Sequence, residues 1–293
     1  MLPIAMLLGI LFHESIGQVA FLSRYLIFTM LLITYCRLKV SDFHIGRYIW
    51  LLLAVQLGGA VGVYQLLSPI DNVLAQGAFI CVFCPTATAA PVITGMLGGS
   101  VGRVAVYSLF SHVNVAFLAP LLLTWVGGSA GGSIGFGESL LTIAQTVLPL
   151  ILGPLAVAAL IGRFAPKAKA AVANHQGLSF YIWAFALLIV VGNSVSFLMK
   201  EPASAIPQIF LLALVALLAC CAQFWAGRKI GARYADKISG AQSLGQKNTV
   251  LAIWLALTYL NPLASAAPAA YVAWHNTINS YQIYRQSRRA KNI

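Results

Sequence analysis

Ten apolar segments follow one another along this chain of 293 residues, and most of them are close to 20 residues long. They lie at about 2–17, 22–36, 45–67, 73–97, 102–126, 139–162, 177–199, 206–227, 241–260 and 262–283. About 20 apolar residues in a helix cross the hydrocarbon core of a bilayer, where only helices and closed barrels satisfy their backbone groups. Because 60% of the residues are hydrophobic and 8% are charged, we expect an all-α membrane protein of about ten transmembrane helices. The first segment is short, which leaves open whether it spans fully.

No polar segment is long enough to form a soluble domain, so we expect residues 1–293 to form a single integral membrane domain. The five cysteines lie within or at the edges of apolar segments. Cys81 and Cys84 have CxxC spacing but lack a second pair, and we interpret them as packing residues. We expect neither a metal nor a cofactor, and no nucleophile–base set or HExxH motif indicates an enzyme.

The sign of the charge alternates from one loop to the next. The even-numbered loops and the two termini carry fifteen basic and two acidic residues, while the odd-numbered loops carry Arg24 and Lys200 against four acidic residues. Because basic loops stay in the cytoplasm, this parity predicts cytoplasmic termini in a multi-pass protein of the bacterial inner membrane. The net charge of +12 is thus a topology signal, and we expect contact with lipid and not with nucleic acid.

An internal repeat is visible in the second and seventh segments. The stretch "LSRYLIFTMLLI" begins at Leu22, and the similar stretch "LSFYIWAFALLI" begins at Leu178, which is an offset of 156 residues. Five segments separate the two, an odd number, so the halves must be inverted relative to each other. We expect two inverted five-helix repeats at about 1–126 and 139–283, followed by a basic tail at 284–293, as in many secondary transporters. Chance similarity between leucine-rich helices is the alternative.

Two segments are interrupted by residues that break helices. The stretch "CPTATAAPVITGMLGG", at 84–99, lies in the fourth segment, and the ninth contains Gly240, Gly245, Gln246, Lys247 and Asn248. Irregular backbone at membrane depth survives only where it faces protein or a wet cavity. Each break begins a new half-helix, whose free N–H groups favour an anion and can be capped by Thr86 or Thr88. Close packing of small residues is the alternative, but it does not account for the prolines or for Lys247.

These two stretches, together with "AAPAAYVAWHNTINS" near the C-terminus, resemble the bile acid:sodium symporter family. The resemblance extends over most of the chain and rests on the order and spacing of the motifs. It implies ten helices, divided into a panel domain of spans 1, 2, 6 and 7 and a core domain of spans 3–5 and 8–10. It also implies that the broken helices 4 and 9 cross at the substrate site.

Family members usually bind two sodium ions near the crossing, but this chain departs from the ligand pattern. The positions that match sodium ligands are Gln56, Ala90, Pro91, Val104, Ser108, Ser243 and Lys247. Four of these residues, Ala90, Pro91, Val104 and Lys247, offer no side-chain oxygen, and only the glutamine of the third span and one hydroxyl of the fifth are retained. Ser243 stands where the family has an acidic ligand, and Lys247 where it has a glutamine.

Lys247 suggests what replaces the sodium ions. A family site with one carboxylate and two sodium ions has a net charge of about +1, and a site without the acid but with a protonated Lys247 has the same charge. A charged lysine at the centre of a membrane helix costs about 2.5–3.5 kcal/mol on insertion scales, so its presence calls for a reason. A snorkelling lysine is the alternative, and its polar neighbours Gln246 and Asn248 favour the interior.

The residues that match substrate contacts in the family are Thr88, Asn248, His275 and Asn276. Lys247, Ser108 and His112 join them as candidate binding residues, since they are polar groups at membrane depth. Two interpretations of His112 and Asn114 stay open at this point: they line the cavity, or they tie helices together. Because histidine titrates near neutrality, His112 and His275 are also candidates for proton coupling.

We therefore expect a secondary transporter of a small or amphipathic organic anion that works by alternating access without sodium. A sodium- or proton-coupled symporter of the same fold is the first alternative. A membrane-embedded enzyme or a sensor is the alternative from another class, and it would need a catalytic set or an output domain that the sequence does not contain.

Overall fold

The computed structural model describes residues 2–19, 21–36, 46–87, 89–128, 136–174, 176–200 and 202–291. Throughout these ranges the regular structure is helical, apart from one isolated bridge between extended residues. The helices in chain order are α1 (Leu2–Leu11), α2 (His13–Gly17), α3 (Leu22–Cys36), α4 (Arg47–Leu67), α5 (Asn72–Phe83), α6 (Ala90–Met96), α7 (Val101–Gly127), α8 (Phe136–Phe164), α9 (Pro166–Asn174), α10 (Gln176–Leu198), α11 (Ile206–Arg233), α12 (Lys237–Gly245), α13 (Thr249–Tyr259) and α14 (Ala266–Lys291). Short 3₁₀ turns, η2 (Ala203–Ala205) and η3 (Pro262–Ser265), precede α11 and α14.

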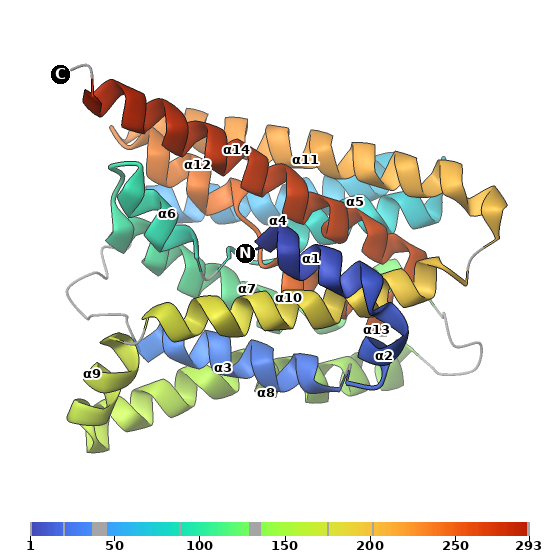
Figure 1. Ribbon diagram of the computed structural model, residues 1–293, viewed down its shortest axis with the longest axis horizontal. Helices are drawn as coiled ribbons and strands as arrows, with labels where there is room; N and C mark the ends of the chain where they lie inside the picture. Colours follow the sequence, from blue (N-terminus) through green and yellow to red (C-terminus); the bar gives the residue numbers. More distant parts are fainter. Residues whose placement is uncertain are drawn as a thin grey trace.

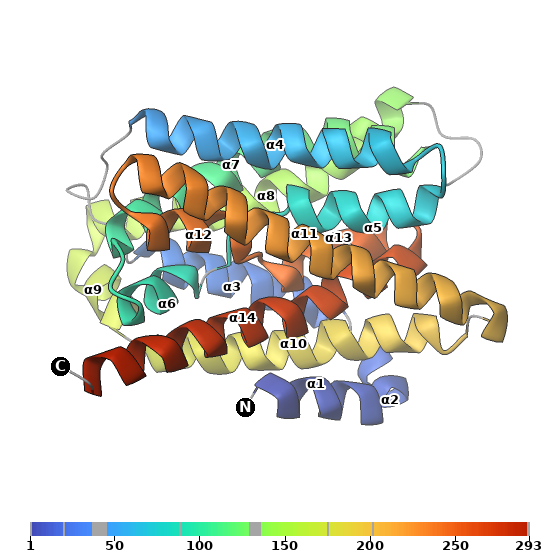
Figure 2. The same cartoon turned by 90° about the horizontal axis from the view of Figure 1, so that it is seen from above.

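The helices form one bundle whose long members run along a common direction (Figures 1 and 2). Within the described residues, four segments are long and apolar enough to cross a membrane: Arg47–Leu67, Val101–Gly127, Leu140–Phe164 and Ala203–Arg233. Shorter apolar helices lie at Leu22–Cys36, Asn72–Phe83 and Thr249–Tyr259. The outward faces of the long segments carry large apolar side chains such as Phe117, Leu160 and Phe210, as expected of surfaces that face lipid.

Charge separates along the bundle as the loop parity predicts. The end marked by the C-terminus in Figure 1 holds the start of α4, α7 and α12, the end of α8, α11 and α14, and helix α9. These elements carry Arg47, Arg103, Arg163, Lys167, Lys169, Arg228, Lys229, Arg233, Lys237, Arg285 and Arg288. The opposite end carries Glu14, Asp71 and Glu138 beside Arg24 and Lys200. One end of the molecule is therefore strongly basic, and we refer to it below as the basic end.

Both predicted interruptions are present. The fourth segment is divided into α5 and α6, and the ninth into α12 and α13, with only residues 246–248 between the last two. The predicted role of Gly240 as a breaker is wrong, because this residue lies inside α12. A Cβ atom on Gly240 would overlap the backbone of Gly227 and Gly231 on α11. The glycine therefore permits close contact between two helices, as small residues do in membrane bundles.

Other boundaries differ from the expected segments. The first segment is divided at Phe12 into α1 and α2, and α9 forms a short separate helix in what the sequence suggests is a basic loop. The basic tail is not a separate segment, since α14 continues to Lys291. Helices α1, α2 and α3 pack on α10, and α3 also packs on α8, while α11 packs on α5, α12 and α14. Helix α11 therefore packs against one half-helix of each interrupted segment, α5 and α12.

Candidate functional site

The two interruptions meet inside the bundle and pair through their backbones. Thr86 and Lys247 form an isolated antiparallel bridge. The N–H of Ala87 donates to the carbonyl of Gln246 at 3.2 Å, and the N–H of Asn248 donates to the carbonyl of Pro85 at 2.8 Å. The non-helical backbone of each interruption thereby finds hydrogen-bond partners in the backbone of the other. Such partners are required at membrane depth, where lipid offers none. We call this junction the crossing.

The carbonyl groups at the C-terminal end of α5 need donors, because the last turn of a helix has no intrahelical partners for them. Lys247 supplies two of these donors: its Nζ lies 2.8 Å from the carbonyl oxygen of Val82 and 3.0 Å from that of Cys84. Its side chain is only 1% exposed. The positive group therefore lies at the negative end of the α5 dipole, where a cation is favoured.

Gln56 on α4 completes this set of donors. Its Nε2 donates to the carbonyl oxygens of Phe83 at 2.7 Å and of Cys84 at 3.2 Å. The amide oxygen of Gln56 is turned the other way and accepts from the hydroxyls of Tyr107 at 2.6 Å and Ser111 at 2.8 Å, both on α7. This oxygen, which a sodium ion would need as a ligand, is thus already engaged by two donors.

The end of α12 is capped in a similar way by residues from other elements. The hydroxyl of Thr86 donates to the carbonyl of Ser243 at 2.8 Å, and that of Tyr271 on α14 donates to the carbonyl of Gly245 at 2.9 Å. Gln223 on α11 joins the two ends, since its Nε2 lies 3.1 Å from the Tyr271 hydroxyl and 3.3 Å from the carbonyl of Cys81. Side chains from α4, α11 and α14 therefore hold both half-helix ends.

The half-helices that leave the crossing begin at α6 and α13. Asn248 is the N-cap of α13, where its Oδ1 accepts from the N–H of Leu251 at 3.2 Å. Its Nδ2 is buried without a hydrogen-bond partner among the described residues. Ala90 and Pro91 form the first turn of α6 and bring no polar side-chain atom. Thr88, the predicted cap on this side, lies outside the described residues, and Thr86 bonds to α12 and not to the start of α6.

The predicted polar residues of α7 form hydrogen bonds within their own helix. Val104, Ser108 and His112 are buried on α7. The Nδ1 of His112 lies 2.7 Å from the carbonyl oxygen of Ser108 on its own helix, and the imidazole packs edge-on against Tyr35 of α3 at 6.0 Å between ring centres. Asn114 likewise donates to Phe110 of its own helix at 2.8 Å, which favours a local role for this amide.

On α14, His275 is 1% exposed and packs edge-on against Tyr271 at 5.6 Å between ring centres. It reaches the crossing through that tyrosine, which bonds to Gly245. The amide of Asn276 donates to the carbonyl of Val272 on the same helix at 2.8 Å. Of the predicted binding residues that the structure describes, Lys247 and Asn248 thus lie at the crossing itself, and His275 contacts it through Tyr271. Ser108, His112 and Asn276 bond within their own helices.

Comparison with known proteins bears on this geometry. The model of the SBF-like CPA transporter family matches residues 20–277. The chain belongs to this family. Membership confirms the resemblance to bile acid:sodium symporter-type proteins and makes the chain an integral membrane transporter. No curated protein matches the sequence.

Sequence reasoning missed two residues that hold the crossing of this SBF-like transporter together, Tyr271 and Gln223, which lie within apolar segments. It also missed Gln76 on α5, which joins other elements: its amide donates to the carbonyl of Val126 at 3.1 Å, and its oxygen accepts from the N–H of Asn261. Each is an uncharged polar residue in a run of apolar ones. That is the signal that could have found them, since polar groups at membrane depth need partners.

The bond from Thr86 to Ser243 gives a direct test of the crossing. Thr86→Val keeps the shape of the side chain but leaves the buried Ser243 carbonyl without its donor, which costs about 1–3 kcal/mol. We expect thermal unfolding of the purified protein in detergent to show this loss. Thr277→Val is the matched control, because the exposed Thr277 hydroxyl bonds only to Ala273 of its own helix. Equal stability of the two variants would contradict the described pairing.

Proposed function

We propose that this SBF-like transporter is a secondary active transporter of a small or amphipathic organic anion that works by alternating access without sodium. Family membership favours transport over catalysis. Half-helices whose ends meet at membrane depth frame the substrate site in many secondary transporters. The crossing between α5, α6, α12 and α13 is such an arrangement, and the substrate site is proposed to lie beside it.

One observation carries the proposal of sodium independence, namely the hydrogen bonding of Lys247 and Gln56. Hard cations bind where several oxygen atoms point into one space. Here the carbonyl oxygens of Val82 and Cys84 accept from Lys247, and the Gln56 amide oxygen accepts from two hydroxyls. The Lys247 ammonium therefore takes the part that a bound sodium ion plays in the family pattern.

The charge around Lys247 favours an anionic substrate. The acidic residues that the structure describes, Glu14, Asp71, Glu138 and Asp236, lie in the first turns or at the caps of helices at the ends of the bundle. None of them forms an ion pair with Lys247 in the described part of the chain. Lys247 directly precedes Asn248, whose buried Nδ2 has no hydrogen-bond partner among the described residues and which caps the start of α13. A positive group, an amide donor and a helix N-terminus together suit a carboxylate or a similar anion.

We also propose ten transmembrane segments in two inverted repeats, with both termini in the cytoplasm. A shared feature supports the relation between the fourth and ninth segments. Asp71 caps α5 by accepting from Leu74 N–H at 2.8 Å, and Asp236 caps α12 by accepting from Ser239 N–H at 3.0 Å. The two half-helices start from opposite ends of the bundle (Figure 1), as inverted repeats require.

Proton coupling within the same fold is the second candidate. It is favoured by the burial of a titratable amine, Lys247, at the point where the two broken helices meet. The imidazole Nε2 of His112 is also buried without a partner among the described residues. An inward proton gradient would accelerate uptake in proteoliposomes if protons are co-transported, and it would leave the uptake of a uniporter unchanged.

A screen of purified protein against bile acids and small carboxylates tests whether substrate binding requires sodium. At least one of them should raise the midpoint of thermal unfolding by mass action. The concentration that gives half of this effect should be the same in sodium chloride and in choline chloride. Stabilisation that requires sodium would contradict the proposal, and no response to the whole panel would contradict an anionic substrate of this class.

Lys247→Gln restores one ligand of the family pattern but leaves Ser243 in place of the acid. The variant should lose affinity for the stabilising anion by roughly tenfold or more, since one charge-assisted hydrogen bond is worth about 1.5–3 kcal/mol. It should gain no sodium dependence, whereas Lys247→Gln combined with Ser243→Glu should regain some.

Lys237→Gln is the matched control for this variant, because Lys237 is exposed at the start of α12. Size-exclusion profiles and unfolding curves must first show that each variant is folded. Wild-type affinity in folded Lys247→Gln would remove Lys247 from the proposed site.

A further inference from the structure

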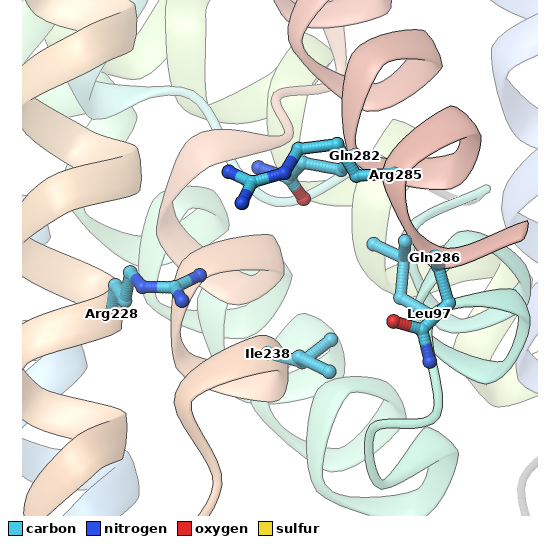
Figure 3. Close-up of a pocket in the computed structure, with 6 residues that line it drawn as sticks. All are labelled: Leu97, Arg228, Ile238, Gln282, Arg285 and Gln286. Atoms are coloured by element: carbon cyan, nitrogen blue, oxygen red, sulfur yellow. The ribbon is translucent and has the colours of Figure 1, made fainter. Parts of the chain in front are cut away.

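A pocket of about 190 Å³ lies at the basic end, away from the crossing. It is bounded by the end of α6, by α11, by the first turn of α12 and by the last turns of α14. The residues that line it are Leu97, Arg228, Ile238, Gln282, Arg285 and Gln286 (Figure 3). Since one water molecule takes about 30 Å³, the space admits a group the size of a phosphate.

The two arginines reach this pocket from different helices. Figure 3 shows Arg228 extending from α11 on one side, while Arg285 extends from α14 beside Gln282. No carboxylate is among the lining residues. The acidic residue at this end in the described chain, Asp236, is engaged elsewhere: it caps α12 and lies 3.6 Å from Arg103. Two guanidinium groups thus share one space without an acid from the lining to separate them.

The amide of Gln282 is oriented as a further donor. Its Oε1 accepts from the Nε2 of Gln242 at 2.9 Å, which leaves the Gln282 NH₂ group available for another partner. The pocket therefore offers hydrogen-bond donors from guanidinium and amide groups together with two positive charges. Guanidinium groups match the oxygen atoms of a phosphate with paired hydrogen bonds.

We propose that this pocket is a binding site for a phosphate group, held between Arg228 and Arg285 with Gln282 as an additional donor. The phosphate can come from the headgroup of an anionic membrane lipid or from a soluble phosphate compound. Basic pockets between membrane helices are suited to lipid headgroups. The proposal is independent of the transported substrate, because it concerns residues outside the crossing.

A chain of amides connects the pocket to the crossing. Gln242 on α12 donates to Gln282 and also lies 3.2 Å from the Oδ1 of Asn279 on α14. Gln246 donates in turn to Gln242, and its own carbonyl accepts from Ala87 across the crossing. A phosphate that holds α11 and α14 together at the pocket would therefore also hold α12, the half-helix that ends at Lys247.

The test uses delipidated, full-length protein in a neutral detergent and follows thermal unfolding. One arm titrates potassium phosphate against potassium chloride of equal ionic strength. The other arm titrates short-chain phosphatidylglycerol against phosphatidylcholine, and native mass spectrometry counts the retained lipid. We expect saturable stabilisation in at least one arm, and a response to phosphatidylglycerol alone identifies the lipid headgroup as the source.

The double variant Arg228→Gln, Arg285→Gln should weaken this response by about tenfold or more, since it removes both charged donors. The control is Lys229→Gln, Arg288→Gln, which removes the same charge from the same two helices at exposed positions that do not line the pocket. An equal loss in both double variants would overturn the site in favour of general surface charge. The absence of any response in the wild-type protein would overturn it as well.

Discussion

Two helices stop in the middle of an apolar bundle, and every carbonyl group that this frees must find a donor where there is no water. The rest of the structure depends on how this is done. The carbonyl oxygen of residue 81 accepts from Gln223, that of residue 82 from Lys247 and that of residue 83 from Gln56. The carbonyl of residue 84 accepts from both Gln56 and Lys247, and that of residue 85 accepts from the N–H of Asn248. Because an unsatisfied buried carbonyl costs about 1–3 kcal/mol, removing any one of these donors should destabilise the whole junction.

The same constraint links the fold to transport. The donors come from α4, α11 and α14 as well as from the paired interruptions, so the junction joins these helices into one unit. In the function proposed above, the Lys247 side chain takes the place of a bound cation. Because a side chain cannot leave the site, that proposal contains no step in which an ion is loaded or released. It makes the substrate anion the partner whose binding changes the charge of the site.

Much of the architecture could be predicted from the sequence because the physics of the membrane is restrictive. The bounds of α3 agree with the predicted segment 22–36, and both interruptions lie where proline, glycine and Lys247 break apolar runs. Gly240 could not be distinguished from a breaker, since its reason for being glycine is a contact with Gly227 on another helix. The partners of Lys247 were equally hidden: they are backbone oxygens 165 and 163 residues away, and a carbonyl leaves no trace in a sequence. Nor could the sequence reveal that Asn276 bonds to its own helix.

We propose that the Lys247 ammonium replaces a bound sodium ion at the crossing, and equilibrium binding of radioactive sodium to the purified wild-type protein tests this replacement. We expect no saturable binding up to physiological sodium concentrations, because the oxygen atoms that would hold the ion already accept hydrogen bonds from Lys247, Tyr107 and Ser111. Saturable binding of one or two sodium ions per chain, with Lys247 intact, would contradict it.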